Sequence, residues 1–310
     1  MKHDPVSNGN KTTSTEFTPL FHSAKIVLGE TAKAVTPFGG LTSFVAFLQQ
    51  IGFAREIQKA LPFPAPTSPN AIPLAHTLTA FIIAVVTGAS RFAHTDWLRA
   101  DRALHAVLGI LRFPGTDTVR NFFLRFTQAH IQAFWRPLWR WLLSMLACPQ
   151  EEFHLDLDST VFQRAGRQEG AAKGYNPRRP GRKSHHPILA VLAEAAFILH
   201  GWLRSGNAGA ARGVVAFLQE ALALLPEGIS VRCVRADSGF FEEALLAFLE
   251  ERKLTYIVVA KLTSSLKRRC AEIKNWTQID EHYAAGEFHA PLQGWSKPRR
   301  FIVIREQIRE

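Results

Sequence analysis

The run His154-Leu155-Asp156-Leu157-Asp158-Ser159-Thr160 alternates apolar with polar side chains, which is the pattern of a half-buried β-strand. Successive side chains of a strand point to opposite faces, so Asp156 and Asp158 share one face and the two leucines share the other. A second apolar run, residues 229–236, leads directly into Asp237. We therefore predict two strands that each end in an aspartate, and we expect these strands to be neighbours in one sheet.

The segments around these two runs predict the rest of the sheet. Two further apolar runs of strand length, residues 187–193 and 196–203, are close enough in sequence to pair with each other. Apolar side chains at helical spacing predict one helix over residues 214–225 and another over residues 241–249, and residues 254–260 indicate a buried strand. The order strand-strand-strand-helix-strand-helix-strand is typical of a ribonuclease-H-like core, in which helices flank a mixed sheet.

The chain before this core has a different pattern. Residues 1–30 are polar and aperiodic, which predicts a disordered tail. From about residue 40 to residue 147 apolar side chains recur at the i, i+3, i+4 and i+7 spacing of a helix. The fold class is therefore α+β, with an all-helical N-terminal domain followed by the mixed-sheet domain.

The charge balance favours a polyanionic partner. The chain has 37 lysines and arginines against 26 aspartates and glutamates, which gives a net charge of +11. An anionic membrane surface is the alternative partner, but it would call for a basic amphipathic helix, and the basic cluster lies in a segment rich in Pro and Gly. The sequence has no signal-peptide-like start and no apolar run of transmembrane length. We expect a cytoplasmic protein that makes no membrane contact.

Residues 164–186 form the most basic segment, with seven lysines and arginines and a single acid. Its glycines and prolines predict an extended, adaptable loop, although a run of charge is also the ordinary composition of a solvated surface. His185 and His186 have no matching His or Cys partner for a metal, which leaves phosphate contact or plain solvation. We predict that the segment grips a DNA backbone by charge, stacking and hydrogen bonding. The predicted DNA-binding residues are Arg164, Arg167, Lys173, Tyr175, Asn176, Arg178, Arg179, Arg182, Lys183, His185 and His186.

Two carboxylates at neighbouring strand ends suit divalent-metal chemistry on a phosphodiester. Magnesium prefers hard oxygen ligands and keeps several waters, so Asp158 and Asp237, with Asp156 as a further candidate, suffice together with substrate phosphate. Two ions roughly 4 Å apart would activate a nucleophile and stabilise the leaving oxygen. The spacing equally allows Asp158 to cap a strand end and Asp237 to start a turn at Ser238-Gly239, because Asp is common at such boundaries.

Four longer motifs carry a family resemblance. Residues 155–161 (LDLDSTV), 168–177 (QEGAAKGYNP), 181–187 (GRKSHHP) and 235–241 (RADSGFF) closely resemble DDE-type transposases of bacterial insertion sequences. The resemblance covers roughly residues 40–310. It implies a ribonuclease-H-like catalytic domain and metal-dependent cutting and joining of transposon ends, with Mg²⁺ or Mn²⁺ as two bound ions.

By this resemblance Asp158 is the first catalytic acid and Asp237 is the second. The family completes its triad with a glutamate, on a helix with a Tyr-x-x-Arg-type signature beyond a β-rich insertion. No such signature occurs here, and Glu306 and Glu310 are poor candidates, so we predict no third acid in this chain. We thus expect a C-terminally truncated transposase. Its expected domains are a disordered tail at 1–30, a helical DNA-binding domain at 31–150, a catalytic domain at 151–263 and the start of the insertion at 264–310.

The predicted function is that of a DNA transposase, which cleaves transposon ends and carries out strand transfer. Its expected partners are the terminal inverted repeats and target DNA, held by a homodimer in the synaptic complex, in the bacterial cytoplasm at the nucleoid. Two alternatives stay open. One is a catalytically incomplete DNA-binding remnant of a transposase, which the missing glutamate would favour. The other is a ribonuclease-H-like nuclease or resolvase that uses different acids.

Overall fold

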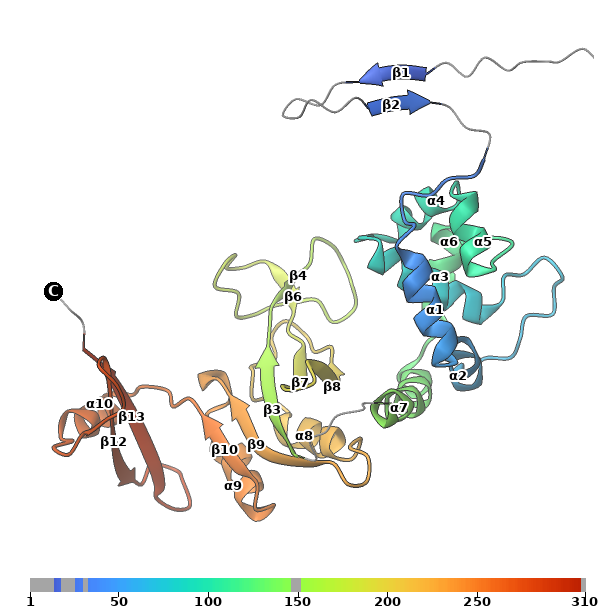
Figure 1. Cartoon of the computed structure of the whole chain (residues 1–310). Coiled ribbons are helices and arrows are strands. Elements are labelled where there is room, and N and C mark those ends of the chain that lie inside the picture. Colours follow the sequence, from blue (N-terminus) through green and yellow to red (C-terminus); the bar gives the residue numbers. More distant parts are fainter. Residues whose placement is uncertain (1–13, 18–25, 30–32, 146–151, 308–310) are drawn as a thin grey trace, which may run out of the picture. The chain divides into compact units, whose positions relative to one another are not determined.

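The computed structural model describes residues 14–17, 26–29, 33–145 and 152–307. The chain divides into two compact units, unit 1 at residues 1–138 and unit 2 at residues 139–310. Figure 1 labels elements of both units where there is room. Among the described residues, no helix is long and apolar enough to cross a lipid bilayer.

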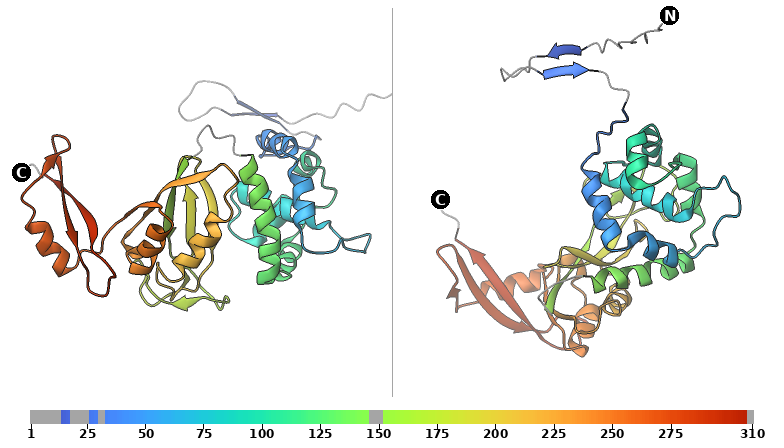
Figure 2. Two further views of the ribbon diagram at one scale, coloured as in Figure 1. Left: turned by 90° about the horizontal axis from the view of Figure 1, so that it is seen from below. Right: turned by 45° about the vertical axis from the view of Figure 1, so that its right-hand side comes forward.

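Unit 1 confirms the predicted helical region. Between residues 33 and 138 its regular structure is entirely helical, and both views of Figure 2 show these helices (blue to green) grouped without a strand among them. Leu41, Ile83, Leu104 and Phe113 are buried in one cluster, because the apolar stripe of each helix turns toward the others. The elements are α1 (Leu41–Gln50), α2 (Phe53–Ala60), α3 (Leu74–Val86), the 3₁₀ helix η1 (Phe92–His94), α4 (Thr95–Leu98), α5 (Arg102–Leu108), α6 (Thr116–Leu124) and α7 (Gln128–Ser144).

Two short strands lie in the segment for which the sequence predicts a disordered tail. Strand β1 (Ser14–Phe17) pairs antiparallel with β2 (Ile26–Gly29). The prediction of disorder is therefore wrong for these residues, and the rest of segment 1–30 lies outside the described residues. The apolar run of β2 has high strand propensity, a local signal that the polar composition of the whole segment conceals.

Unit 2 is built on a five-stranded mixed sheet with the strand order β10-β9-β3-β7-β8. Strand β3 runs parallel to β9 and β9 runs parallel to β10, whereas β3 pairs antiparallel with β7 and β7 with β8. The predicted mixed sheet and its order of elements are confirmed. The elements are β3 (Glu152–Ser159), β7 (Ile188–Leu192), β8 (Phe197–Trp202), α8 (Val214–Leu222), β9 (Ser230–Ala236), the 3₁₀ helix η2 (Ser238–Phe240), α9 (Glu243–Glu251) and β10 (Thr255–Val258).

The core of unit 2 follows the alternation seen in the sequence. Phe153, Leu155 and Leu157 of β3 are at most 3% exposed, and helices α8 and α9 bury Phe217 and Leu249 in the same core. Burying each such side chain contributes about 1.5–3 kcal/mol. This burial fixes the register of β3, because a slip by one residue would send the leucines to solvent and the aspartates into the core.

Helix α7 also contributes to this core, although the sequence places its whole length in the helical domain. The indole of Trp139 donates a hydrogen bond to the carbonyl of Ile198 in β8 at 2.7 Å. Leu143 is 1% exposed and packs in the core of unit 2. The second compact unit thus begins at Trp139, inside the helix, whereas the sequence places the end of the helical domain at residue 150, which stays a prediction.

Two smaller sheets complete unit 2. Strands β4 (Phe162–Gln163), β5 (Ala172–Lys173) and β6 (Lys183–His185) form one with the order β4-β6-β5. Beyond β10, helix α10 (Ser264–Ala271) leads into an antiparallel sheet of β11 (Thr277–Gln278), β12 (Tyr283–Ala290) and β13 (Arg299–Glu306). This C-terminal sheet accounts for residues 277–306 of the segment predicted to begin a β-rich insertion.

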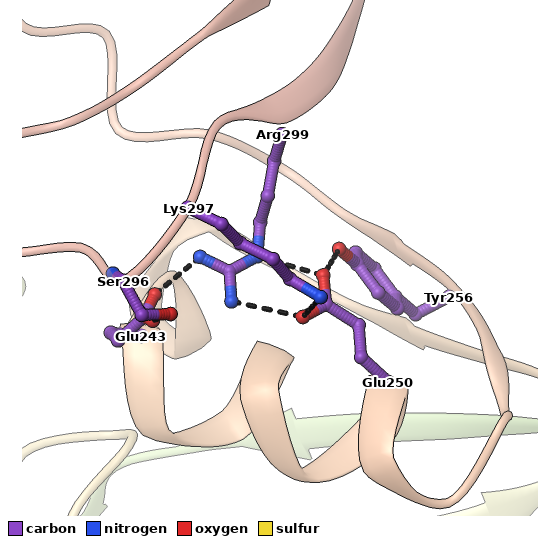
Figure 3. Close-up of polar contacts among 6 residues, drawn as sticks. All are labelled: Glu243, Glu250, Tyr256, Ser296, Lys297 and Arg299. Atoms are coloured by element: carbon purple, nitrogen blue, oxygen red, sulfur yellow. Dashed lines mark hydrogen bonds and ion pairs between the residues drawn. The ribbon is translucent and has the colours of Figure 1, made fainter.

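Arg299, the first residue of β13, ties the C-terminal sheet to α9 (Figure 3). Its side chain is 4% exposed, and it donates to Glu250 at 2.8 and 3.0 Å and also to Glu243. Glu250 accepts a further hydrogen bond from the hydroxyl of Tyr256 at 2.8 Å, and Lys297 lies 3.1 Å from it. We call these five residues the Arg299 cluster.

In the Arg299 cluster the pKa values of Glu250, Tyr256 and Arg299 are shifted so that each group keeps its ordinary protonation state at neutral pH. The hydrogen bond from Arg299 is the main reason that the pKa of Glu250 falls to about 2. Burial, and then the hydrogen bond to Glu250, raise the pKa of Tyr256 to about 12. Burial works against the charge on Arg299, but the hydrogen bonds to the two glutamates outweigh it and its pKa is raised.

Candidate active site

The pairing of β3 with β9 places the two predicted catalytic aspartates together. The last parallel pair is Leu157 with Ala236, so Asp158 and Asp237 follow as the next residue of each strand. Neighbouring strands lie about 4.8 Å apart, and paired residues of parallel strands point to the same face. Both aspartates are exposed. The structure therefore brings the two carboxylates side by side at the carboxyl end of the sheet.

Local backbone groups orient both carboxylates. Oδ1 of Asp158 accepts a hydrogen bond from the N–H of Ser159 at 2.7 Å, and Oδ1 of Asp237 accepts one from the N–H of Gly239 at 2.9 Å. Asp237 is thereby the N-cap of η2, as the turn interpretation of the sequence predicts. Within the described part of the chain, the Oδ2 atom of neither residue takes part in a hydrogen bond or an ion pair. One oxygen of each aspartate is free for a ligand.

Asp156, the further candidate metal ligand, is paired with a cation of the neighbouring strand. Its carboxylate receives two hydrogen bonds from Arg235, at 2.6 and 2.7 Å, because the two residues are direct partners in the β3–β9 register. This bidentate pair occupies both oxygens. The sequence shows that Asp156 and Asp158 share a strand face, but it does not show that Arg235 lies opposite Asp156 on the neighbouring strand.

A cleft of about 650 Å³ opens beside the aspartate pair. Asp237 lines it directly, and so does Ser159, which follows Asp158. Its lining is mostly polar, with two cations, Arg178 and Lys261, and the phenol of Tyr175. The remaining lining residues are Thr160, Val161, Gln163, Asn176, Pro177, His186, Gly209, Ala210, Ser238 and Gly239.

The basic segment contains three short strands joined by turns and loops. Strands β4, β6 and β5 pair within residues 162–185, and we call residues 162–185 the basic sheet. The predicted loop thus includes a small sheet, and its adaptability stays a prediction. Among the residues that the structure describes, six of its cations are exposed and form no ion pair. These are Arg167, Lys173, Arg178, Arg179, Arg182 and Lys183. Arg164 instead donates to His185 at 3.0 Å and lies over the ring of Phe162.

Two glycines hold the basic sheet against the chain that follows β8. A Cβ atom on Gly174 would lie 1.9 Å from the carbonyl oxygen of Gly206, and one on Gly206 would lie 2.1 Å from that of Ser184. Only glycine allows so close a backbone approach. The approach places Tyr175 and Asn176, the next residues, in the wall of the cleft.

His185 and His186 are buried and hydrogen-bonded within the fold, and their contact with DNA stays a prediction. Each is 5% exposed. His185 accepts from Arg164 and donates from Nε2 to the carbonyl of Glu169 at 2.8 Å, and His186 donates from Nδ1 to the carbonyl of Ala208 at 2.8 Å. Buried polar groups are hydrogen-bonded in this way when they stabilise a fold. His186 nevertheless forms part of the cleft wall.

Lys261 is the cleft residue that the sequence analysis did not single out. Val258 is the partner of Ala236 in the parallel pairing of β10 with β9, so Lys261 lies just beyond the carboxyl end of the third parallel strand. Ligands of open α/β sheets bind at the carboxyl ends of strands, and that rule applied to residues 254–260 would have found it.

The donor set at the strand ends fits a divalent ion. Asp158 and Asp237 supply hard oxygen atoms side by side, and each keeps one oxygen free of protein contacts within the described residues. Magnesium needs only one or two protein carboxylates when water and substrate phosphate complete its octahedron. The residues described by the structure contain no group of three His, Cys, Asp or Glu side chains that could hold a metal. Within the described residues the strand ends therefore present two carboxylates, and the absence of a third acid stays a prediction.

The family model of the transposase DDE domain, group 1, matches residues 18–309. The chain belongs to this family. The match confirms the resemblance drawn from the four motifs, and it spans unit 1 as well as the sheet that carries the aspartates. Derivation from a bacterial insertion sequence and C-terminal truncation stay predictions.

Solved transposase structures resemble this transposase domain at low identity. The synaptic complex of piggyBac transposase with hairpin DNA is 14% identical, with a TM-score of 0.41, over 86% of this chain and 60% of that chain. The Mos1 transposase paired-end complex with the left transposon end is 11% identical, with a TM-score of 0.24, over 77% of this chain and 90% of that chain. The mariner Mos1 paired-end complex with Mg is 11% identical, with a TM-score of 0.21, over 77% and 85%. No curated protein matches the sequence.

Proposed function

We propose that this transposase domain cleaves DNA at transposon ends and joins those ends to target DNA. The observation that carries the proposal is the register of β3 and β9, which sets Asp158 and Asp237 side by side. The pair borders a polar cleft, and the basic sheet forms part of the same wall. A phosphodiester requires both features, carboxylates for divalent metal and cations for the flanking backbone.

The side chains of the site divide the work between them. Asp158 and Asp237 would hold Mg²⁺ or Mn²⁺ through their free oxygens, while the N–H groups of Ser159 and Gly239 keep the carboxylates oriented. A divalent ion held there would supply the chemistry that activates an attacking oxygen and stabilises charge on a leaving oxygen. The exposed arginines of the basic sheet would bind backbone phosphates and fix the register of the DNA without reading its sequence.

A catalytically incomplete, DNA-binding form of the domain is the second candidate function. It is favoured by one observation, namely that the described residues hold two acids and no third metal-binding group at the site. Glu306, which ends β13, accepts a hydrogen bond from Tyr283 at 3.1 Å, and Glu310 lies outside the described residues. In this case the chain would occupy transposon ends without cutting them.

The partners follow from the same proposal. Terminal inverted repeats and target DNA would be the substrates, and two copies of the chain would pair the ends in a synaptic complex. The bacterial cytoplasm, at the nucleoid, is the corresponding location. The net charge of +11 supports a DNA partner, because it raises the rate of encounter with a polyanion.

Substitution of the aspartates tests the catalytic assignment. Asp158→Asn and Asp237→Asn should each reduce Mg²⁺-dependent cleavage of transposon-end DNA by at least about 100-fold, because each removes an ionic metal ligand. DNA binding, measured by fluorescence anisotropy, should stay near the wild-type value. Glu227→Gln is the matched control, an exposed acid just before the opposite end of β9.

The outcomes separate the two candidate functions. Cleavage that survives in both aspartate variants would rule out the assignment of the metal site. A wild-type chain that binds the ends tightly, yet cuts neither end under any divalent ion, would support the DNA-binding form.

A further inference from the structure

Lys261 is one of two cations that line the cleft. It is exposed, lines the cleft together with Asp237, and forms no ion pair within the described residues. Its backbone is held on both sides, since the N–H of Val259 donates to Ala236 at 3.0 Å and the N–H of Thr263 donates to Lys261 at 2.8 Å. The backbone around Lys261 is thus held at the cleft, and its ammonium group forms no ion pair within the described residues.

Asn176, which also lines the cleft, has a side-chain donor without a hydrogen-bond partner. It is 7% exposed, and its Oδ1 accepts a hydrogen bond from the N–H of Arg179 at 3.0 Å. That bond fixes the orientation of the amide, because an amide nitrogen could not accept it. Nδ2 is consequently a buried donor, and it has no hydrogen-bond partner. An unsatisfied buried donor costs about 1–3 kcal/mol, and such groups in native proteins call for a functional explanation.

We propose that Lys261 and Asn176 form a phosphodiester-binding subsite that positions the DNA backbone against the aspartate pair, an inference that rests on the proposed function. A phosphate supplies what both groups lack, a negative charge for the ammonium and acceptor oxygens for the amide N–H. Arg178 lines the same cleft and adds a third donor group. Lys261 lies just beyond the end of β10, which is the neighbour of β9, the strand that leads into Asp237.

The salt dependence of DNA binding tests Lys261. Duplexes taken from the DNA that borders the coding sequence serve as probes, and affinity is measured by anisotropy over a series of salt concentrations without added divalent ion. Lys261→Gln should reduce the slope of log K against log salt by about 0.9, the value for one lost phosphate contact. The matched control is Lys253→Gln, which removes an exposed lysine just before the opposite end of β10 and should leave the slope unchanged.

Asn176→Asp separates a binding role from a structural one. Aspartate keeps the acceptor for the N–H of Arg179 but replaces the free donor by an acceptor that repels phosphate. The variant should melt near the wild-type temperature and bind the duplex more weakly. If it fails to fold, the Lys261 measurement decides the proposal alone.

Failure of the subsite and failure of the proposed function give different results. If the wild-type chain binds DNA and Lys261→Gln has the wild-type slope, the subsite is refuted and the proposed function stands. If the wild-type chain binds no DNA, the proposed function is refuted and the subsite with it.

Discussion

Asp156 and Asp158 are two residues apart on the same strand, yet their surroundings give them different roles. Asp156 faces Arg235 across the β3–β9 pair and is neutralised by it. Asp158 faces Asp237, where like charges at adjacent strand ends repel unless a cation lies between them. The same register thus sets Asp156 opposite an arginine and Asp158 opposite a second aspartate.

The backbone at Gly174 lies so close to Gly206 that a side chain there should be destabilising. Gly174→Ala should lower the free energy of unfolding by at least about 1–3 kcal/mol, because a Cβ atom would overlap the backbone of Gly206. Urea denaturation measures the change. Gly209→Ala is the control, since a Cβ atom there meets nothing within 4 Å. Equal losses in the two variants would show that the close approach of the backbones is not the cause.

Among the elements, β13 and α9 are joined by the Arg299 cluster. β13 contributes the cation, α9 contributes Glu243 and Glu250, and β10 contributes Tyr256. A buried charge of this kind is tolerated only when it is fully paired, so the three elements depend on one another. The cluster therefore fixes the C-terminal sheet to the core that carries the aspartates.

Removal of the cation should be costly. Arg299→Ala leaves two glutamates without their partner and should destabilise unit 2 by about 3–5 kcal/mol, as measured by urea denaturation. The neighbouring Arg300 pairs with Glu287 at an exposed position, with 58% of its side chain accessible. Arg300→Ala should therefore change stability by no more than about 1 kcal/mol. A small loss in the Arg299 variant would mean that the cluster contributes little.

The Arg299 cluster also predicts a dependence of stability on pH. The pKa of Glu250 is about 2 in the folded chain against an ordinary value of 4.5, so the folded state binds fewer protons between these values. Its contribution to stability is complete above pH 4.5 and is lost as the pH falls toward 2. Tyr256 affects stability in the alkaline range. Its pKa is raised from 10 to about 12, so its contribution to the stability of the folded chain is lost as the pH rises from 10 to about 12.

Denaturation midpoints measured across the acid range test the role of Glu250. The wild-type midpoint should fall more steeply below pH 4.5 than that of Glu250→Gln, which has no proton to bind at this position. Parallel curves for the two proteins would contradict the prediction.

Over the whole molecule, the positive charge is spread widely but gathers on the basic sheet. The combined substitution of Arg178, Arg179 and Arg182 by Gln should weaken the salt dependence of DNA binding. The slope of log K against log salt should fall by up to about 2.7, which is about 0.9 for each lost phosphate contact. All three are exposed and form no ion pair in the described part of the chain, so folding should be preserved. An unchanged slope in a folded variant would remove the basic sheet from the DNA interface.

Local patterns in the sequence predicted most of the helices and strands of the mixed-sheet domain. Alternation in residues 154–159 and helical spacing in the segments after them predicted the elements of the mixed sheet, because burial selects one face of each element. The four motifs were sufficient for the family. The pairing of Asp158 with Asp237 also followed, since two parallel neighbours must end at the same edge.

Contacts between residues distant in sequence decided the rest, and no local pattern encodes them. The pairing of Asp156 with Arg235, the burial of His185 and His186, and the folding of the basic segment all depend on what another strand places opposite. The Arg299 cluster likewise joins residues far apart in sequence. The sequence by itself determined the family and predicted the two acids. Only the tertiary structure decided which charged groups are paired, because neutralisation requires a partner within a few ångströms.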